Sequence, residues 1–248
     1  MKQKKTKHEF RSNTLPALIT VGPVTLLMVL LIAVPLIYVA VMSFCSIDEF
    51  YNVTFQFTLQ NYVRLANTDY LRIYAQSMGI ALVTTLICIL VGYPFSYIIA
   101  RTKSRKKKIL YMLVIIPFWT NSLIRIYGWR NLLGTSGRLN GLLMKLHLVS
   151  ESVDLLYKQG TTILGMVYCL IPFMILPLYS NMQKIDTSVL EAGRDLGATN
   201  FQLFWKVIFP VSLPGLSSGI VLVFIPAMAN FFITDMLGGG KSINVGNV

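Results

Sequence analysis

Residues Asp186–Pro210 read DTSVLEAGRDLGATNFQLFWKVIFP and predict two short helices between long apolar segments. Ser188 and Glu191 have the spacing of a capping box, so the first helix should begin at this point. Gly197 should end that helix, because glycine adopts the left-handed conformation that closes a helix without a steric clash. The stretch is therefore a predicted helical hairpin.

The second helix of this hairpin should begin at Thr199, since Gln202 again completes the spacing of a capping box. It carries an apolar stripe at helical spacing, made of Phe201, Phe204, Trp205 and Ile208. The first helix instead presents charged side chains, namely Glu191, Arg194 and Asp195. This combination favours a surface that docks onto another protein, with an ordinary amphipathic hairpin as the alternative.

The composition of the whole chain is that of a membrane protein. Hydrophobic residues make up 54% and charged residues only 13%, whereas about a quarter of the residues of a soluble protein are charged. A membrane-spanning helix needs about 20 apolar residues. Four stretches of sufficient length contain no Asp, Glu, Lys or Arg, and they lie within 12–47, 73–100, 159–183 and 207–234. With a shorter one at 109–124, they predict an all-α polytopic helical bundle with five spans.

The basic residues indicate the orientation of these spans. The net charge is +12, and Lys and Arg gather in the first eleven residues and in 101–108. By the positive-inside rule both segments are cytoplasmic, and alternation then places the hairpin 186–210 in the cytoplasm as well. The basic segments flank apolar runs, so they favour lipid headgroups as their partner and argue against nucleic acid. We expect a cytoplasmic N-terminus over residues 1–14 and a membrane domain over 15–248.

At the hairpin, the sequence resembles a known signature. Glu191-Ala192-Gly193, Gly197 and Val207–Pro210 follow the EAA motif, which reads EAA, three residues, glycine, nine residues and an I-x-L-P end. This motif belongs to the permease subunits of binding-protein-dependent ABC importers. The resemblance implies a cytoplasmic coupling helix that sits in a groove of a separate ATPase, and the implied contact residues are Glu191, Ala192, Gly193, Asp195 and Gly197.

No motif for ATP hydrolysis or metal binding is present in the sequence. Gly238–Ser242 resembles the end of a phosphate-binding loop, but Asp235 stands where that motif needs its first glycine. The three cysteines and the isolated His147 do not have the spacing of metal ligands. We therefore expect a transport subunit that is not an enzyme and binds no cofactor, with ATP and Mg in a partner ATPase.

Over its whole length the chain resembles the permease subunits of spermidine/putrescine ABC importers. This resemblance implies a type I importer permease in the bacterial inner membrane, with six spans in the family, of which five are visible here. It also implies three partners: an ATPase dimer, a second similar permease subunit and a periplasmic polyamine-binding protein. A permease for another small solute, a secondary transporter and a non-transporting membrane scaffold remain as alternatives.

A path for a polyamine needs carboxylates for its ammonium groups and aromatic faces for cation–π contact. Asp235 lies at the outer end of the fifth span, and Trp119, Tyr127 and Trp129 lie near the outer end of the third. Arg125 interrupts the third span, so it either faces a cavity or lies at the interface, stacked on Tyr127 or Trp129. We predict an entry route among these five residues. Alternatively, Asp235 pairs with Arg125 or caps its own helix.

Two further expectations concern packing and loops. Gly215 and Gly219, four residues apart in the fifth span, would allow another helix to approach closely. Outside the membrane, residues 45–72 should form a solvated loop, with a segment that rests on the membrane face or meets an outer partner as the alternative. The loop 130–159 should contain a short helix near 139–148 and is long enough to receive a soluble protein.

Overall fold

The computed structural model describes residues 5–47, 53–239 and 244–247. The chain divides into two compact units, one ending at Tyr70 and one beginning at Leu71. Within the described residues, four helices are long and apolar enough to cross a membrane, or up to five if a bent helix pair is one span. The predicted all-α membrane architecture is confirmed, and each unit is described separately below.

The first unit consists of one long helix and a small hairpin. Helix α1 (Lys5–Ser43) contains the predicted first span, and its apolar part, Val21–Ser43, buries no side chains within the unit. Strands β1 (Cys45–Ile47) and β2 (Val53–Phe57) then pair antiparallel, and helix α2 (Gln60–Leu65) follows. These strands lie where the sequence predicted a loop, so that prediction is wrong at this point.

The second unit is a bundle around three long helices. Helix α3 (Thr68–Arg101) and helix α7 (Gln159–Met182) confirm the second and fourth predicted spans. The third runs from Asn200 to Ala229 through α9 (Asn200–Leu203), the π-helical turn η1 (Phe204–Ile208) and α10 (Phe209–Ala229). The predicted second helix of the hairpin is thus the first part of a span.

Two of the predicted spans are broken. Helix α4 (Ser104–Trp119) is followed, after a two-residue break, by α5 (Ser122–Leu133), and the chain bends there by 93°. The fifth predicted span ends early, because the helix stops at Asn230 and restarts as α11 (Phe231–Gly238). Helix α6 (Arg138–Lys145) confirms the short helix expected in the loop after α5.

Helices α7 and α10 pack closely through the two predicted glycines. A Cβ atom at Gly215 would lie 2.6 Å from the carbonyl oxygen of Pro177, and one at Gly219 would lie 2.7 Å from the sulfur of Met174. Only glycine allows the two backbones to approach this closely. The prediction of close helix approach is confirmed.

The break at Asn230 is covered by a short 3-10 turn, η2 (Val245–Asn247). The Asn247 Oδ1 accepts hydrogen bonds from the Thr234 hydroxyl (2.9 Å) and the Asn244 N–H (3.0 Å), and the Val245 N–H donates to Ser77 Oγ on α3 (2.9 Å). The turn therefore fixes the α10–α11 break against α3. Most of the glycine-rich stretch 238–242, compared above with a phosphate-binding loop, lies outside the described residues.

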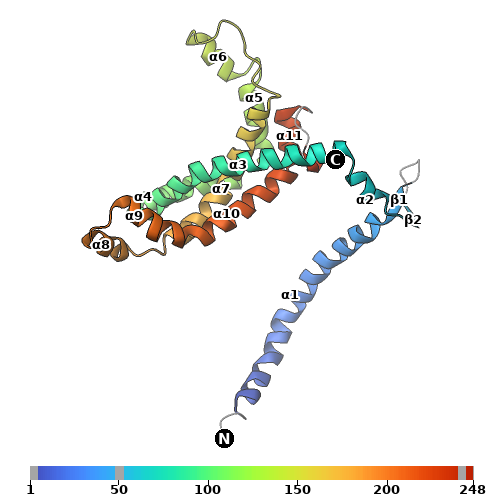
Figure 1. Cartoon of the computed structure of the whole chain (residues 1–248), viewed down its shortest axis with the longest axis vertical. Helices are drawn as coiled ribbons and strands as arrows, with labels where there is room; N and C mark the ends of the chain where they lie inside the picture. Colours follow the sequence, from blue (N-terminus) through green and yellow to red (C-terminus); the bar gives the residue numbers. More distant parts are fainter. Residues whose placement is uncertain (1–4, 48–52, 240–243, 248) are drawn as a thin grey trace. The chain divides into compact units, whose positions relative to one another are not determined.

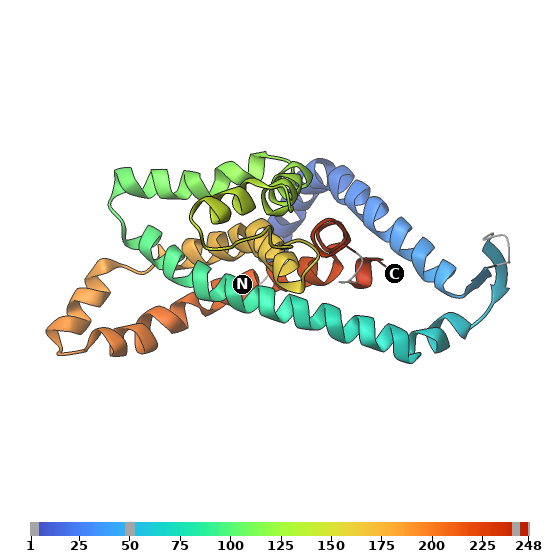
Figure 2. The ribbon, with the colours of Figure 1, turned by 90° about the horizontal axis from the view of Figure 1, so that it is seen from above.

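The long helices separate two regions of the second unit. Helices α8 (Thr187–Asp195) and α9 lie at one end of α7 and α10, and α11 lies at the other end (Figures 1 and 2). The hairpin and helix α11 are therefore at opposite ends of the long helices (Figure 1).

Candidate functional site

The hairpin begins with a different cap from the one that the sequence predicted. Helix α8 starts at Thr187, and the Asp186 carboxylate accepts a hydrogen bond from the Ser188 N–H at 3.2 Å. The capping box between Ser188 and Glu191 is therefore wrong, because the helix begins before Ser188. Glu191 is left exposed on the surface of α8.

Gly197 ends α8 as predicted. Its φ is +82°, a left-handed conformation that favours glycine. The Gly197 N–H donates to the Arg194 carbonyl at 2.8 Å, and the Ala198 N–H donates to the Gly193 carbonyl at 3.0 Å. These two hydrogen bonds form a Schellman motif, which satisfies carbonyl groups at the helix end and fixes the direction of the following chain.

The second half of the hairpin begins with the predicted capping box. The Gln202 N–H donates to Thr199 Oγ1 at 3.3 Å, and the Thr199 N–H donates to Gln202 Oε1 at 2.9 Å. The π-helical turn η1 follows, a type of irregularity that often occurs at functional positions. The turn between α8 and α9 is therefore fixed by hydrogen bonds on both sides.

A small apolar cluster attaches the hairpin to the bundle. Leu190, the buried residue of α8, packs in a cluster with Ile185 and Ile208. On α3, the Tyr93 hydroxyl lies 2.8 Å from Ser212 Oγ, and one Arg101 Nη donates to the Ile185 carbonyl at 3.1 Å. These contacts hold the hairpin against α3 and α10.

The outer face of the hairpin combines charged and apolar side chains. Glu191 and Asp195 are exposed, and so are the apolar side chains of Leu196 and Phe201, at 88% and 72%. Large apolar side chains with this much exposure beside charged residues are typical of a protein interface. The geometry thus fits the predicted docking surface.

Gly193, the residue that departs from the EAA motif, lies where the two halves of the hairpin meet. A Cβ atom there would lie 2.6 Å from Cδ2 of Leu203, which is buried. The glycine allows α9 to pack directly on α8, so its position has a structural reason.

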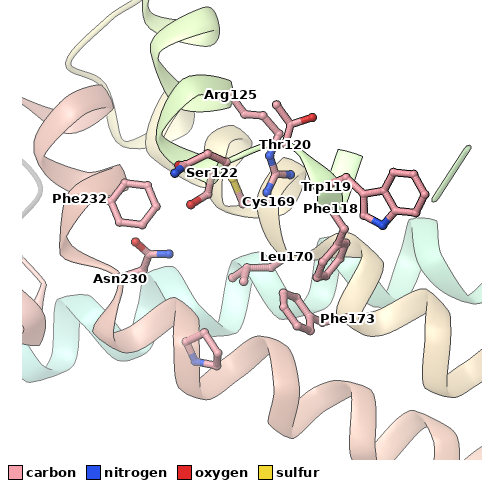
Figure 3. Close-up of a pocket in the computed structure, with 12 residues that line it drawn as sticks. Phe118, Trp119, Thr120, Ser122, Arg125, Cys169, Leu170, Phe173, Asn230 and Phe232 are labelled. Carbon is pink, nitrogen blue, oxygen red and sulfur yellow. The ribbon is translucent and has the colours of Figure 1, made fainter. Parts of the chain in front are cut away.

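The second candidate region is a cavity of about 600 Å³ between the broken helices (Figure 3). The end of α4, the start of α5, the middle of α7 and the α10–α11 break form its walls. Its lining residues are Phe118, Trp119, Thr120, Asn121, Ser122, Arg125, Cys169, Leu170, Phe173, Pro226, Asn230 and Phe232. Cys169 and Leu170 are near the midpoint of α7, so the cavity lies at mid-depth of a spanning helix.

Arg125 points into this cavity from the first turn of α5 (Figure 3). Asn121 orients that turn, because its Oδ1 accepts a hydrogen bond from the Leu123 N–H at 2.8 Å. The Arg125 guanidinium carbon lies 5.6 Å from the centre of the Tyr168 ring. The predicted stacking on Tyr127 or Trp129 is therefore wrong, and the alternative, a cavity-facing arginine, agrees with the structure.

The five residues proposed for the path do not meet at one point. Trp119 and Arg125 line the first cavity, where the Trp119 side chain is 84% exposed. Tyr127 and Asp235 line a second cavity of about 540 Å³, together with Arg130, Tyr157, Met236 and Gly239. Trp129 instead packs edge-on against Tyr168, with ring centroids 5.6 Å apart. No ion pair joins Asp235 to Arg125, although both side chains are described.

Several residues of the first cavity were not predicted from the sequence. Phe118 and Phe173 pack edge-to-face across its wall at 4.8 Å, and Asn230 marks the helix break. The buried Asn230 Oδ1 has no hydrogen-bond partner among the described residues. The sequence feature that could have identified Asn230 is a lone amide side chain within a charge-free apolar run, four residues after Pro226.

Comparison with known protein families gives a match over much of the chain. Residues 92–247 match the model of the binding-protein-dependent transport system inner membrane component. The spermidine/putrescine transport system permease protein PotB of Haemophilus influenzae is 41% identical over 230 residues, which cover 93% of this chain and 80% of that protein. PotB of Escherichia coli K12 is 41% identical over 221 residues, covering 89% and 80%.

A similar fold also occurs among solved structures. The bacterial alginate ABC transporter, crystallised with its alginate pentasaccharide-bound periplasmic protein, contains a chain that aligns with a TM-score of 0.72. The aligned part covers 99% of this chain and 83% of that chain, at 17% sequence identity. This similarity supports the overall fold of the chain.

Proposed function

The chain belongs to the family of inner membrane components of binding-protein-dependent transport systems, and from this membership we propose that it is a permease subunit of an ABC importer for spermidine and putrescine. One observation carries the choice of cargo. The identity to spermidine/putrescine permeases extends over nearly the whole chain, and is not confined to the hairpin that all importers of this class need.

The hairpin is the proposed contact with the ATPase. Its exposed face would fit into a groove of that subunit, with Glu191, Ala192, Gly193, Asp195 and Gly197 at or next to the contact. The Schellman motif at Gly197 and the capping box after it support this role, because a coupling element must keep its shape while the ATPase moves. ATP and Mg would be held by the ATPase dimer, and this chain would bind neither.

A second permease subunit and a periplasmic polyamine-binding protein would complete the importer. The cavity that contains Asp235, Tyr127 and Tyr157 has one carboxylate and two aromatic rings, which are groups that recognise an ammonium ion, beside the guanidinium group of Arg130. This composition supports a place for it on the cargo path. The first cavity has aromatic walls, but its one charged lining residue is Arg125, so it offers an ammonium ion no carboxylate.

An uptake assay tests the proposed cargo. The chain would be co-expressed with its own partner subunits in a strain that lacks polyamine uptake, and entry of labelled spermidine would be measured. We expect uptake that requires the chain and ATP and is inhibited by unlabelled putrescine but not by an amino acid or a sugar. Absence of uptake with all subunits in the membrane would contradict the proposal, as would competition by an unrelated solute.

Reporter fusions test the proposed orientation. A reporter joined after Lys108 or Lys206 should lie in the cytoplasm, because the positive-inside rule places the first position inside and alternation of the spans places the second there. A reporter joined after Glu151 should lie outside. If the first two fusions report different sides, the proposed number of crossings between them is wrong.

A further inference from the structure

The first cavity contains a charge whose hydrogen bonds are incomplete. Arg125 is the one charged residue among its lining residues, and the other lining residues are apolar, aromatic or neutral polar. Its Nε and Nη1 atoms are buried and have no hydrogen-bond partner among the described residues. The Tyr168 ring at 5.6 Å stabilises the cation through its face but accepts no hydrogen bond from these nitrogens.

At the depth of this cavity, a guanidinium group with unpaired nitrogens is energetically unfavourable in a single chain. Cys169, Leu170 and Phe173 place the cavity near the middle of α7, and a charge at that depth in a membrane protein faces water or pairs with an opposite charge. A buried charge without hydrogen-bonded partners is strongly destabilising. The guanidinium group therefore needs an acceptor, which is either water in the cavity or a carboxylate.

The described acidic residues of the second unit do not supply that acceptor. Asp186, Glu191 and Asp195 lie in the hairpin, at the opposite end of the long helices from α11 (Figure 1). Asp235 lines the other cavity, and Glu151 and Asp154 are exposed in the loop after α6. Among the described residues of the second unit, Arg125 therefore has no carboxylate partner.

We propose that the second permease subunit inserts an aspartate or glutamate side chain into the first cavity, where its carboxylate pairs with Arg125. The planar guanidinium is suited to a carboxylate, because it presents several N–H donors in a fixed geometry. The aromatic walls would exclude water around the pair and strengthen it.

Cargo is a poor alternative occupant. The inference rests here on the proposed function, since spermidine and putrescine are polycations and a guanidinium group repels them. The binding protein is a second alternative, but its docking surface lies outside the membrane, and the cavity lies at mid-depth of α7. A subunit that shares the membrane with this chain is the partner that fits both charge and depth.

Carbodiimide coupling in the assembled importer tests this pairing. Arg125→Lys keeps the positive charge and introduces an amine that a carbodiimide can join to a carboxylate in contact with it. We expect an amide crosslink, located by mass spectrometry, between position 125 and an Asp or Glu of the second permease subunit. The matched control is Arg138→Lys, the same substitution at an exposed arginine at the start of α6. This variant should give no amide with the second permease subunit.

A second measurement does not depend on crosslinking. Arg125→Gln removes the charge, so less of the second permease subunit should co-purify with this chain, whereas Arg138→Gln should leave its recovery unchanged. Equal recovery for both variants, no intersubunit amide in an intact complex, or an amide to an acid of this chain or of the binding protein would each overturn the proposal.

The same preparations separate this inference from the proposed function. The unmodified complex would also be assayed for spermidine uptake. Uptake without the intersubunit amide would refute the pairing and leave the polyamine assignment intact. An intersubunit amide in a complex that transports another solute would refute the polyamine assignment while supporting the pairing.

Discussion

The hairpin 186–210 and the cavity around Arg125 are built in different ways. Contacts between near neighbours in the sequence fix the turn of the hairpin: an Asp186 cap, a Schellman motif at Gly197 and a capping box at Thr199. The cavity instead needs three regions that are far apart in the sequence: the α4–α5 break, the middle of α7 and the α10–α11 break. A locally fixed hairpin can keep its shape while it transmits motion, whereas the cavity must change when the helices around it move.

The largest effect on uptake is expected from Gly197→Val, which alters the locally fixed turn of the hairpin. A β-branched residue at φ +82° is strained by about 1–3 kcal/mol, and the strain falls on the turn that sets the angle between α8 and α9. Polyamine uptake should fall about tenfold or more, since 1.4 kcal/mol corresponds to a factor of ten. The amount of protein in the membrane should remain near normal, because no side chain packs around this position.

The control for this variant is Gly79→Val, the same substitution at an exposed glycine within α3. Its uptake should stay close to that of the unmodified protein. Normal uptake by the Gly197→Val variant, at equal amounts in the membrane, would rule out the hairpin as the coupling element.

A second prediction concerns the packing that supports the cavity. In Gly215→Val, the new Cβ atom would lie 2.6 Å from the backbone oxygen of Pro177, which cannot move away as a side chain can. Overpacking of this kind costs about 1–3 kcal/mol. The midpoint of thermal unfolding in detergent should fall by several degrees, and Gly79→Val again provides the comparison. An unchanged midpoint would mean that α7 and α10 separate more easily than their packing indicates.

The contrast between the two regions also explains what the sequence could predict. Gly197 and Thr199 were identified because their effects are local, and charge-free runs located the long helices because membrane burial acts on every residue of a span. The cap at Ser188 was wrong because Asp186, two residues earlier, competes for the same role. Local signals can thus misplace a helix end by a few residues while predicting its existence correctly.

The cavity was only partly predictable for a physical reason. Arg125 was identified by its charge, but its neighbour Tyr168 lies on another helix, and no local pattern connects the two. The 93° bend between α4 and α5 and the break at Asn230 depend on tertiary packing, including the hydrogen bonds of turn η2. Residues such as Trp119 and Asp235 were grouped by their position in the chain, and the structure divides them between two cavities.

The placement of Trp119 and Asp235 in different cavities leads to a third prediction, with an effect of intermediate size on spermidine affinity. Because Arg125 in the first cavity repels a polycation, Asp235→Asn in the second cavity should weaken apparent spermidine affinity by about fivefold, through loss of an interaction of about 1 kcal/mol, whereas Trp119→Ala should leave it near normal. Transport assays over a range of spermidine concentrations would measure this. Glu151→Gln, which removes an exposed acid in the outer loop, is the control and should have little effect. An effect of Asp235→Asn alone would place the path in the second cavity, and unchanged affinity and maximal rate in both variants would place it elsewhere.

The smallest effect is expected from Gly193→Ala, which converts the hairpin to the usual EAA motif. The new methyl group would lie 2.6 Å from Leu203 Cδ2, and the next nearest atom is Leu203 Cγ at 3.9 Å. The close contact is with the end of a flexible side chain, which a rotation can move, and alanine favours a helix over glycine by about 1 kcal/mol. These two effects oppose each other, so uptake should change by less than about twofold.

Gly193→Leu is the matched test of the packing argument, because its larger side chain cannot be accommodated by a rotation of Leu203 and should reduce uptake clearly more than alanine does. Equal uptake by the alanine and leucine variants would show that α8 and α9 are not held together at this point, and the hairpin would then be less rigid than its caps imply.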